Sequence, residues 1–386
     1  MRLTRLFLAC ALSLCAASVA AAQTPRRAED FYNRGLERHG QRDYDGAIAD
    51  YTQAIALDPK MTDAYNNRAN ARLLKGDYEG AVADYTQAIA TRPGDHLGYY
   101  NRGVAHMGNG DYDKAVADFD RAHALNPKFP MTLNNRGNAK KFKGDFDGAI
   151  ADFDLALRLQ PDAPATYYNR GTARQAKGEH AAALADFDKA LALRPRFAEA
   201  FNNRGLSHQA LRDYQKALAD YTRAAELAPE DAEVFMNRGI LHQMSGETDA
   251  SIADFSRAIA VNPQLSEAYA QRGAAYVTKK NARAALADFD RALELNPANA
   301  LAYTHRGLLR REAGDHAGAL SDFTQAIATN PSLAQAYANR GVVYLLQGRA
   351  ERADKDFSKA FELDPSLRPA FEKYIAEVKR IQAQKP

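Results

Sequence analysis

Cysteine and tryptophan are almost absent from this chain, and neither sign of charge dominates it. Its only two cysteines are Cys10 and Cys15, it has no tryptophan, and its net charge is +3. Both cysteines lie in an N-terminal segment that we expect to be removed, so we expect no disulfide, no thiolate nucleophile and no cysteine-bound metal. Without Arg2 and Arg5 the charge falls to +1. Nucleic acid is therefore not an expected partner.

Long hydrophobic runs are also scarce, and the one at the start has the pattern of a signal peptide. Two arginines precede an apolar run at 6–14, and three alanines at 20–22 precede Gln23. This order predicts a signal peptide over 1–22, export, and in a bacterium a periplasmic location. The alternative is a membrane anchor, but the run is shorter than the roughly 20 residues that span a bilayer. We expect no membrane insertion once the signal is removed.

Catalytic motifs are missing. The chain contains no GxGxxG, GxxxxGK[ST], HExxH or GxSxG pattern, and no two of its nine histidines lie four residues apart. Because the histidines are spread over several positions of the repeat described next, we expect them to be surface residues. The sequence predicts no enzymatic activity, no cofactor and no metal site.

A 34-residue repeat organises the rest of the chain. An Asn-Arg-Gly triplet or a close variant recurs at this spacing ten times, and a proline follows each triplet at a fixed distance. The ten units cover 28–367 and begin at residues 28, 62, 96, 130, 164, 198, 232, 266, 300 and 334. Such a period is typical of stacked helical hairpins, and it overrides the two or three globular domains that the length alone suggests.

Each unit contains two helices with complementary packing positions. Helix A takes about the first 14 positions and has an aromatic at position 4 (Leu133 in one unit) and Gly at position 8 (Ala69 in one unit). Helix B has Ala at 20 (Ser251 in one unit), Tyr or Phe at 24 and Ala at 27, and Pro at 32 ends it. Small residues allow the helices to approach closely, and the aromatics fill the remaining space.

These positions resemble those of the tetratricopeptide repeat family over 28–367. Departures are Tyr or Phe for the common Trp at position 4 and Arg for Leu at position 7. The resemblance implies an all-α, right-handed superhelix with a concave groove, lined by A helices, that binds peptides or partner helices. Residues 23–27 form a short lead-in. An apolar stripe predicts a capping helix over 368–386, with an amphipathic membrane-binding helix as the alternative.

Arginine at position 7 and aspartate at position 23 occur in all ten units. In an antiparallel hairpin these two positions lie at nearly equal depth, so we predict that they pair at the seam between helices A and B as a structural ion-pair ladder. An anion- or metal-binding ladder is the alternative. Representative pairs are Arg34 with Asp50, Arg68 with Asp84, Arg170 with Asp186, and Arg340 with Asp356.

Asparagine at position 6 lies on the helix A face opposite positions 4, 8 and 11, and so should face the groove. Its amide can donate to and accept from a peptide group, as in the asparagine ladder of some long family members. A purely local structural role is an equal alternative. The eight residues are Asn33, Asn67, Asn101, Asn135, Asn169, Asn203, Asn237 and Asn339.

The other groove positions change character along the chain. Early units carry further asparagines, Asn66, Asn70, Asn134 and Asn138, and later units carry Met236, Ile240 and Leu308. The later residues predict an apolar groove for a partner helix, or they pack between repeats. No unit has Lys or Arg at positions 5 and 9, which disfavours the family's clamp for terminal carboxylates.

These observations favour a protein–protein interaction scaffold or adaptor in the periplasm or cell envelope, with proteins or peptides as partners. The alternative is a carrier of extended or unfolded polypeptides in transit.

Overall fold

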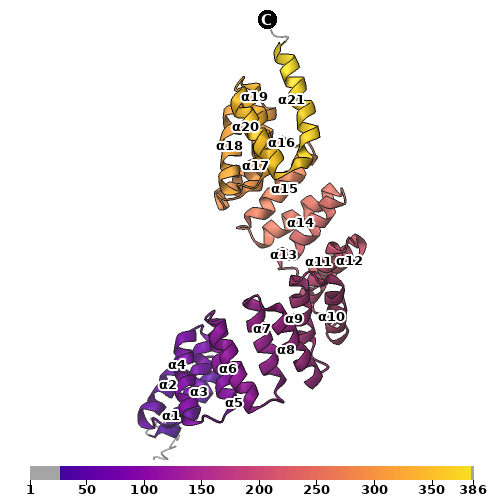
Figure 1. Cartoon of the computed structure of the whole chain (residues 1–386). Helices are drawn as coiled ribbons and strands as arrows, with labels where there is room; N and C mark the ends of the chain where they lie inside the picture. Colours follow the sequence, from indigo (N-terminus) through magenta and orange to yellow (C-terminus); the bar gives the residue numbers. More distant parts are fainter. Residues whose placement is uncertain (1–26, 384–386) are drawn as a thin grey trace, which may run out of the picture. The chain divides into compact units, whose positions relative to one another are not determined.

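The computed structural model describes residues 27–383, and within them the chain is all-α, without a strand (Figure 1). The predicted signal peptide over 1–22 lies outside the described residues. The chain divides between Pro161 and Asp162 into two compact units. Each unit is a series of antiparallel helical hairpins.

The first unit contains four hairpins. In each, the odd-numbered helix is helix A and the even-numbered helix is helix B. The helices are α1 (Ala28–Gly40), α2 (Tyr44–Leu57), α3 (Thr62–Leu74), α4 (Tyr78–Thr91), α5 (His96–Gly108), α6 (Tyr112–Leu125), α7 (Pro130–Phe142) and α8 (Phe146–Leu159).

The second unit contains six hairpins and a terminal helix. Its helices are α9 (Pro164–Ala176), α10 (His180–Leu193), α11 (Ala198–Ala210), α12 (Tyr214–Leu227), α13 (Ala232–Met244), α14 (Thr248–Val261), α15 (Ser266–Thr278), α16 (Ala282–Leu295), α17 (Ala300–Glu312), α18 (His316–Thr329), α19 (Ala334–Leu346) and α20 (Ala350–Leu363), and then a 3₁₀ turn η1 (Pro365–Leu367) and α21 (Arg368–Ala383). The boundaries repeat with the 34-residue period of the sequence.

The core of each hairpin forms where the ring at position 24 meets the small residue at position 8. A Cβ atom added to Gly171 would lie 2.7 Å from the Phe187 ring, so a larger residue would displace the ring. The ring is fully buried, and so is Ala190 at position 27. Because helix A has no side chain at this point, helix B packs directly against its backbone.

The turn between the two helices is closed by backbone geometry at position 15. Gly144 has φ +82°, and the N–H of Asp145 donates to the carbonyl of Lys140, which ends helix A in a Schellman motif. Asp145 then caps helix B by accepting from the N–H of Gly148 at 2.9 Å. Three repeats lack glycine here, yet Arg42, Arg212 and Lys280 adopt the same positive φ.

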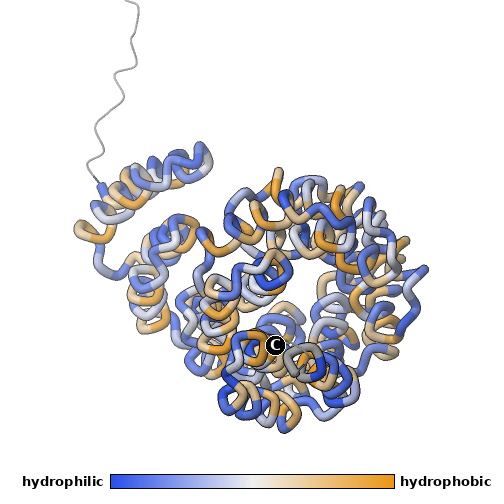
Figure 2. The backbone as a smooth tube through the Cα atoms, turned by 90° about the horizontal axis from the view of Figure 1, so that it is seen from above, coloured by the Kyte–Doolittle hydropathy of each residue, from blue (hydrophilic) through white to orange (hydrophobic). Residues whose placement is uncertain are grey.

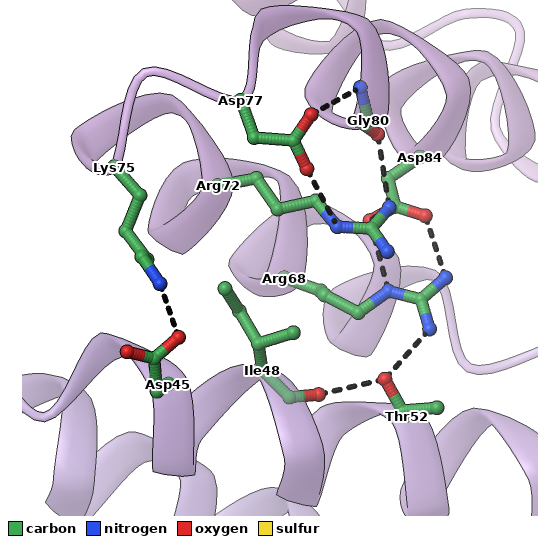
Figure 3. Close-up of polar contacts among 9 residues, drawn as sticks. All are labelled: Asp45, Ile48, Thr52, Arg68, Arg72, Lys75, Asp77, Gly80 and Asp84. Atoms are coloured by element: carbon green, nitrogen blue, oxygen red, sulfur yellow. Dashed lines mark hydrogen bonds and ion pairs between the residues drawn. The ribbon is translucent and has the colours of Figure 1, made fainter.

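The arginine at position 7 makes a two-pronged ion pair with the aspartate at position 23 (Figure 3). Arg68 Nε and Nη2 donate to the two carboxylate oxygens of Asp84 at 2.8 and 2.6 Å. The same contact occurs in all ten repeats, and all ten aspartates are buried. The carboxylates therefore lie at the seam between helices A and B, where each already has a cation.

The same arginine also bonds to the preceding repeat. Arg68 Nη1 donates to the Thr52 hydroxyl of α2 at 3.0 Å, and its guanidinium lies over the Tyr65 ring. Equivalent bonds reach position 25 of the preceding repeat from Arg102, Arg136, Arg204, Arg238, Arg272, Arg306 and Arg340. Arginine thus replaces the family's leucine with a residue that connects neighbouring hairpins.

A second basic side chain, at position 11, accompanies most of these aspartates. Arg72 reaches Asp84 at 2.8 Å, whereas His106 stands in the same place beside Asp118. His208 and His242 also occupy position 11, and His106 is only 8% exposed. The prediction that the histidines are surface residues is therefore wrong for His106, because position 11 faces the hairpin seam.

Helix α21 covers the last repeat. Phe371, Ile375 and Val378 pack against α19 and α20, through residues that include Val342 and Phe361. Most of its apolar stripe therefore packs against the last hairpin.

Among the described residues, no helix is long and apolar enough to cross a membrane. Hydrophobic and hydrophilic residues are interspersed along the helices (Figure 2).

Candidate functional site

An open hollow in the first unit lies between helices α1 and α3. Its volume is about 520 Å³, and its lining comes from positions 9, 12 and 13 of the first repeat and 6, 9, 12 and 13 of the second. Leu36 and Leu74 are 41% and 57% exposed, which is high for leucine. The remaining lining residues are His39, Gly40, Asn67, Asn70 and Leu73. The hollow therefore combines exposed leucines with two amide side chains.

The two amides in this hollow each keep one hydrogen-bonding group free. Asn67 Nδ2 donates to the Tyr32 hydroxyl at 2.9 Å, which leaves its Oδ1 as an acceptor. Asn70 Oδ1 accepts from the Tyr85 hydroxyl at 2.5 Å, which leaves its Nδ2 as a donor. One acceptor and one donor, a helical turn apart on α3, match the N–H and C=O of a peptide main chain.

The bond between Asn67 and Tyr32 is one of a series that joins neighbouring A helices. Asn135 donates to the Tyr100 hydroxyl at 2.9 Å and Asn203 to the Tyr168 hydroxyl at 3.0 Å. Burial raises the pKa of Tyr100, so its phenol stays protonated and retains an O–H donor. In each pair the tyrosine O–H can still donate, whereas Asn135 Oδ1 already accepts from Asn134 at 3.3 Å.

The remaining position 6 asparagines differ in their surroundings. Asn237 donates to Asn202 Oδ1 at 3.0 Å, whereas Asn339 is only 4% exposed and bonds within α19 and to α17. Asn33 is exposed, and Asn101 and Asn169 are half-buried. In four repeats, the asparagine donor is therefore already engaged by the preceding A helix, so a purely open ladder is not what the chain forms. Binding of a partner's main chain through the remaining hydrogen-bonding groups of these asparagines stays a prediction.

The additional early asparagines are also partly engaged. Asn66 Oδ1 is buried without a hydrogen-bond partner among the described residues. Asn134 Nδ2 donates to Asn135 Oδ1 at 3.3 Å, and Asn138 is half-buried. Only Asn70, of these, lines the large hollow.

The expected apolar groove of the later repeats is not open. Met236 is 7% exposed in a core cluster with Phe235, and Ile240 packs against that cluster. Leu308 packs against a second cluster that contains Phe323. These three side chains therefore fill space between packed helices, which was the stated alternative.

Exposed apolar side chains instead occupy positions 2 and 13 of helix A. Leu97 and Met131 at position 2 are 43% and 51% exposed, and Phe142 and Met244 at position 13 are 60% and 56% exposed. The sequence carries this signal as apolar residues at positions 2 and 13 of these repeats.

A smaller hollow in the second unit lies among α17, α19 and α21. Its volume is about 230 Å³. Its lining combines one charged residue with apolar and aromatic ones, and consists of Arg311, Asn339, Val342, Ala370, Phe371 and Tyr374. Within the part of the chain that the structure describes, no group of three or more His, Cys, Asp or Glu side chains is placed to hold a metal ion.

Models of the tetratricopeptide repeat match nearly the whole repeat region. Those described as "Tetratricopeptide repeat" match residues 32–96, 96–129, 164–197, 204–274, 266–299 and 334–367, and one described as "TPR repeat" matches 142–178 and 307–348. The chain belongs to the tetratricopeptide repeat family. No curated protein matches the chain.

Solved structures of other family members resemble this repeat chain. A tetratricopeptide repeat protein from Parabacteroides merdae is 21% identical, covers 67% of this chain and 98% of its own, and gives a TM-score of 0.50, which supports the fold. MamA is 29% identical over 42% of this chain and 96% of its own, with a TM-score of 0.40. YrrB, described as a TPR protein with an unusual peptide-binding site, is 27% identical over 48% and 95%, with a TM-score of 0.41.

Proposed function

We propose that this tetratricopeptide repeat protein is a non-catalytic adaptor that binds extended segments of partner proteins on its A helices. The single observation that carries the proposal is the hollow between α1 and α3, where exposed Leu36 and Leu74 flank the free amide groups of Asn67 and Asn70. Apolar side chains of the partner bury against the leucines, and its main chain bonds to the amides. Neither kind of contact requires a charged partner.

The cell envelope is the proposed location. The basic start, the short apolar run and the alanine triplet over 1–22 support export, and the absence of cysteine after Cys15 is compatible with an oxidising compartment. In that compartment, the adaptor holds components of a larger assembly together. A carrier of unfolded polypeptides would use the same main-chain contacts, but it would bind many clients briefly.

Site-specific photo-crosslinking tests the proposal. Benzoylphenylalanine replaces Leu74, which lines the hollow, or Leu57, which lies at the end of α2, does not line the hollow and is 54% exposed. We expect adducts with envelope proteins from position 74 and few or none from position 57. One dominant adduct supports the adaptor, and a smear of many supports the carrier. Equal adducts from both positions contradict a binding site in this hollow.

Asn67→Ala with Asn70→Ala in the same crosslinking protein separates the amides from the leucines. Loss of the position 74 adduct, with the helical content of the protein unchanged, supports main-chain recognition. An undiminished adduct shows that the leucines act alone. Fractionation of cells that express the full chain tests the location independently, because retention in the cytoplasm contradicts export.

A further inference from the structure

Among the described residues Arg311 has no acidic partner, although its neighbours along the chain and in space are paired. Arg310 bonds to Asp322 at 2.9 Å, and Arg340 to Asp356 at 2.8 Å. Arg311 is half-buried, and no carboxylate of the described chain lies within 4.0 Å of its guanidinium. Its one side-chain hydrogen bond within the described part of the chain goes from Nη1 to Asn339 Oδ1 at 2.8 Å. None of the described residues engages the other guanidinium N–H groups.

Asn339 holds this guanidinium in place. It is 4% exposed, and its Nδ2 donates to the backbone carbonyl of Gln335 at 2.8 Å, which fixes the direction of its Oδ1. Arg311 therefore lines the hollow with one of its guanidinium nitrogens held in place by α19. A guanidinium fixed in advance loses less conformational entropy when it binds a ligand.

The walls around Arg311 are mainly apolar and come from two other helices. Val342 belongs to α19, and Ala370, Phe371 and Tyr374 belong to α21. The hollow that they line is small, about 230 Å³, and open to solvent on one side. A ligand that enters it meets a cation on one side and hydrocarbon on the other, where low polarity strengthens an ion pair.

We propose that this hollow binds a carboxylate carried on a small apolar group, with Arg311 as its counter-ion. A carboxylate matches the fork of a guanidinium with two parallel hydrogen bonds. In a partner protein this chemistry comes either from the chain terminus or from an acidic side chain beside apolar residues. The inference rests on the proposed function, and it names the chemical class of one group through which the partner binds. It differs from the family's clamp, because Arg311 occupies position 12 and positions 5 and 9 carry no Lys or Arg.

The competing explanation is that Arg311 only connects α17 to α19. Gln175 shows what such a connection requires, since it occupies the same position in its own repeat. Its Nε2 donates to the Asn203 carbonyl at 3.0 Å and to the Ser207 hydroxyl at 3.2 Å of the next helix A. Arg311→Gln therefore keeps a donor for Asn339 while it removes the positive charge. Arg283→Gln is the matched control, because Arg283 is exposed and lies on helix B outside the hollow.

Fluorescence anisotropy with three labelled peptides tests the proposal on the full repeat chain. All share the sequence Gly-Ser-Gly-Ala-Leu. The first has a free terminal carboxylate, the second a terminal carboxamide, and the third a carboxamide after an added Glu. We expect the first or the third to bind about tenfold or more tightly than the second, in line with a charge-assisted bond. Tighter binding of the first peptide alone shows that the hollow recognises the carboxylate of a chain terminus. Equally tight binding of the third shows that it also accepts the carboxylate of an acidic side chain.

The variants decide between the two roles of Arg311. The preference for a carboxylate should vanish in Arg311→Gln and persist in Arg283→Gln. Equal binding of all three peptides to the unmodified protein, a preference that survives Arg311→Gln, or no binding of any peptide overturns the carboxylate site. These outcomes leave the crosslinks from position 74 unaffected, so failure of this inference is distinguishable from failure of the proposed function.

Discussion

Arg68 and Asp84 connect more than the two helices on which they lie. Arg68 donates two hydrogen bonds to Asp84 of α4 and a third to Thr52 of α2, so one guanidinium joins three helices of two repeats (Figure 3). Asp84 also forms an ion pair with Arg72. The buried carboxylate is thus the acceptor for two arginines, and the strength of each repeat's ion pair depends on what occupies position 11.

We expect the loss of one arginine to cost most where no second cation is present. Among the described residues Asp288 pairs with Arg272 alone, because position 11 of that repeat is Tyr276. Arg272→Ala leaves a buried carboxylate without a counter-ion, at a cost of about 3–5 kcal/mol in the free energy of unfolding. Arg68→Ala should cost less, since Asp84 keeps Arg72. Urea unfolding of both variants measures the difference.

The double replacement Arg272→Leu with Asp288→Leu provides the control for that prediction. Removing both charges avoids an orphaned carboxylate, so much of the lost stability should return. A double variant no more stable than Arg272→Ala would show that the tie to Ser256 in the preceding repeat dominates.

Three turns carry a residue that is poorly suited to their backbone. Lys280 has φ +58°, where a side chain costs roughly 1–2 kcal/mol relative to glycine. We expect Lys280→Gly to raise the free energy of unfolding by about 1 kcal/mol after the entropic cost of glycine is included. Gly246→Ala, at φ +78° in the preceding repeat, should lower it. If both variants unfold at the same denaturant concentration as the unmodified chain, backbone strain at this turn is negligible.

The position 6 asparagines should contribute to stability in proportion to their bonds. Asn135→Ala removes a hydrogen bond to Tyr100 and should lower the free energy of unfolding by about 0.5–1.5 kcal/mol. Asn33→Ala removes an exposed side chain in the first repeat and should change it by less than about 0.5 kcal/mol. Equal effects would mean that the inter-repeat bond adds nothing measurable.

The repeat itself made the hairpins predictable. A fixed 34-residue period with small residues at 8 and 20 leaves one way to pack helix A on helix B, and the depth argument placed Arg at 7 opposite Asp at 23. Side chains that bridge repeats were harder to predict. Whether Asn67 faces a ligand or Tyr32 depends on the rotation between successive hairpins, which no pattern within one unit specifies. For the same reason the sequence left two roles open for Met236, and its core cluster with Phe235 and Ala268 shows that it packs between repeats.

Acid should weaken the second unit through His305. Its ring stacks on Phe289 at 5.7 Å, and burial lowers its pKa in the folded chain. In the unfolded chain the pKa is near 6.5, so as pH falls below that value the unfolded state binds the proton first. Stability is therefore full above about pH 6.5 and declines as pH falls toward the lower pKa of the folded state. The slope for one histidine cannot exceed about 1.4 kcal/mol per pH unit.

His305→Asn tests this assignment, because asparagine is the residue that eight other repeats carry at the same position. Asparagine does not titrate in this range, so the free energy of unfolding of the variant should vary less between pH 7.5 and 5 than that of the unmodified protein. His106 and His123, whose pKa values are also lowered mainly by burial, retain their share of the dependence in both proteins. The difference between the two curves therefore reports His305 alone. Parallel curves would mean that the imidazole is solvated enough to titrate as it does in the unfolded chain.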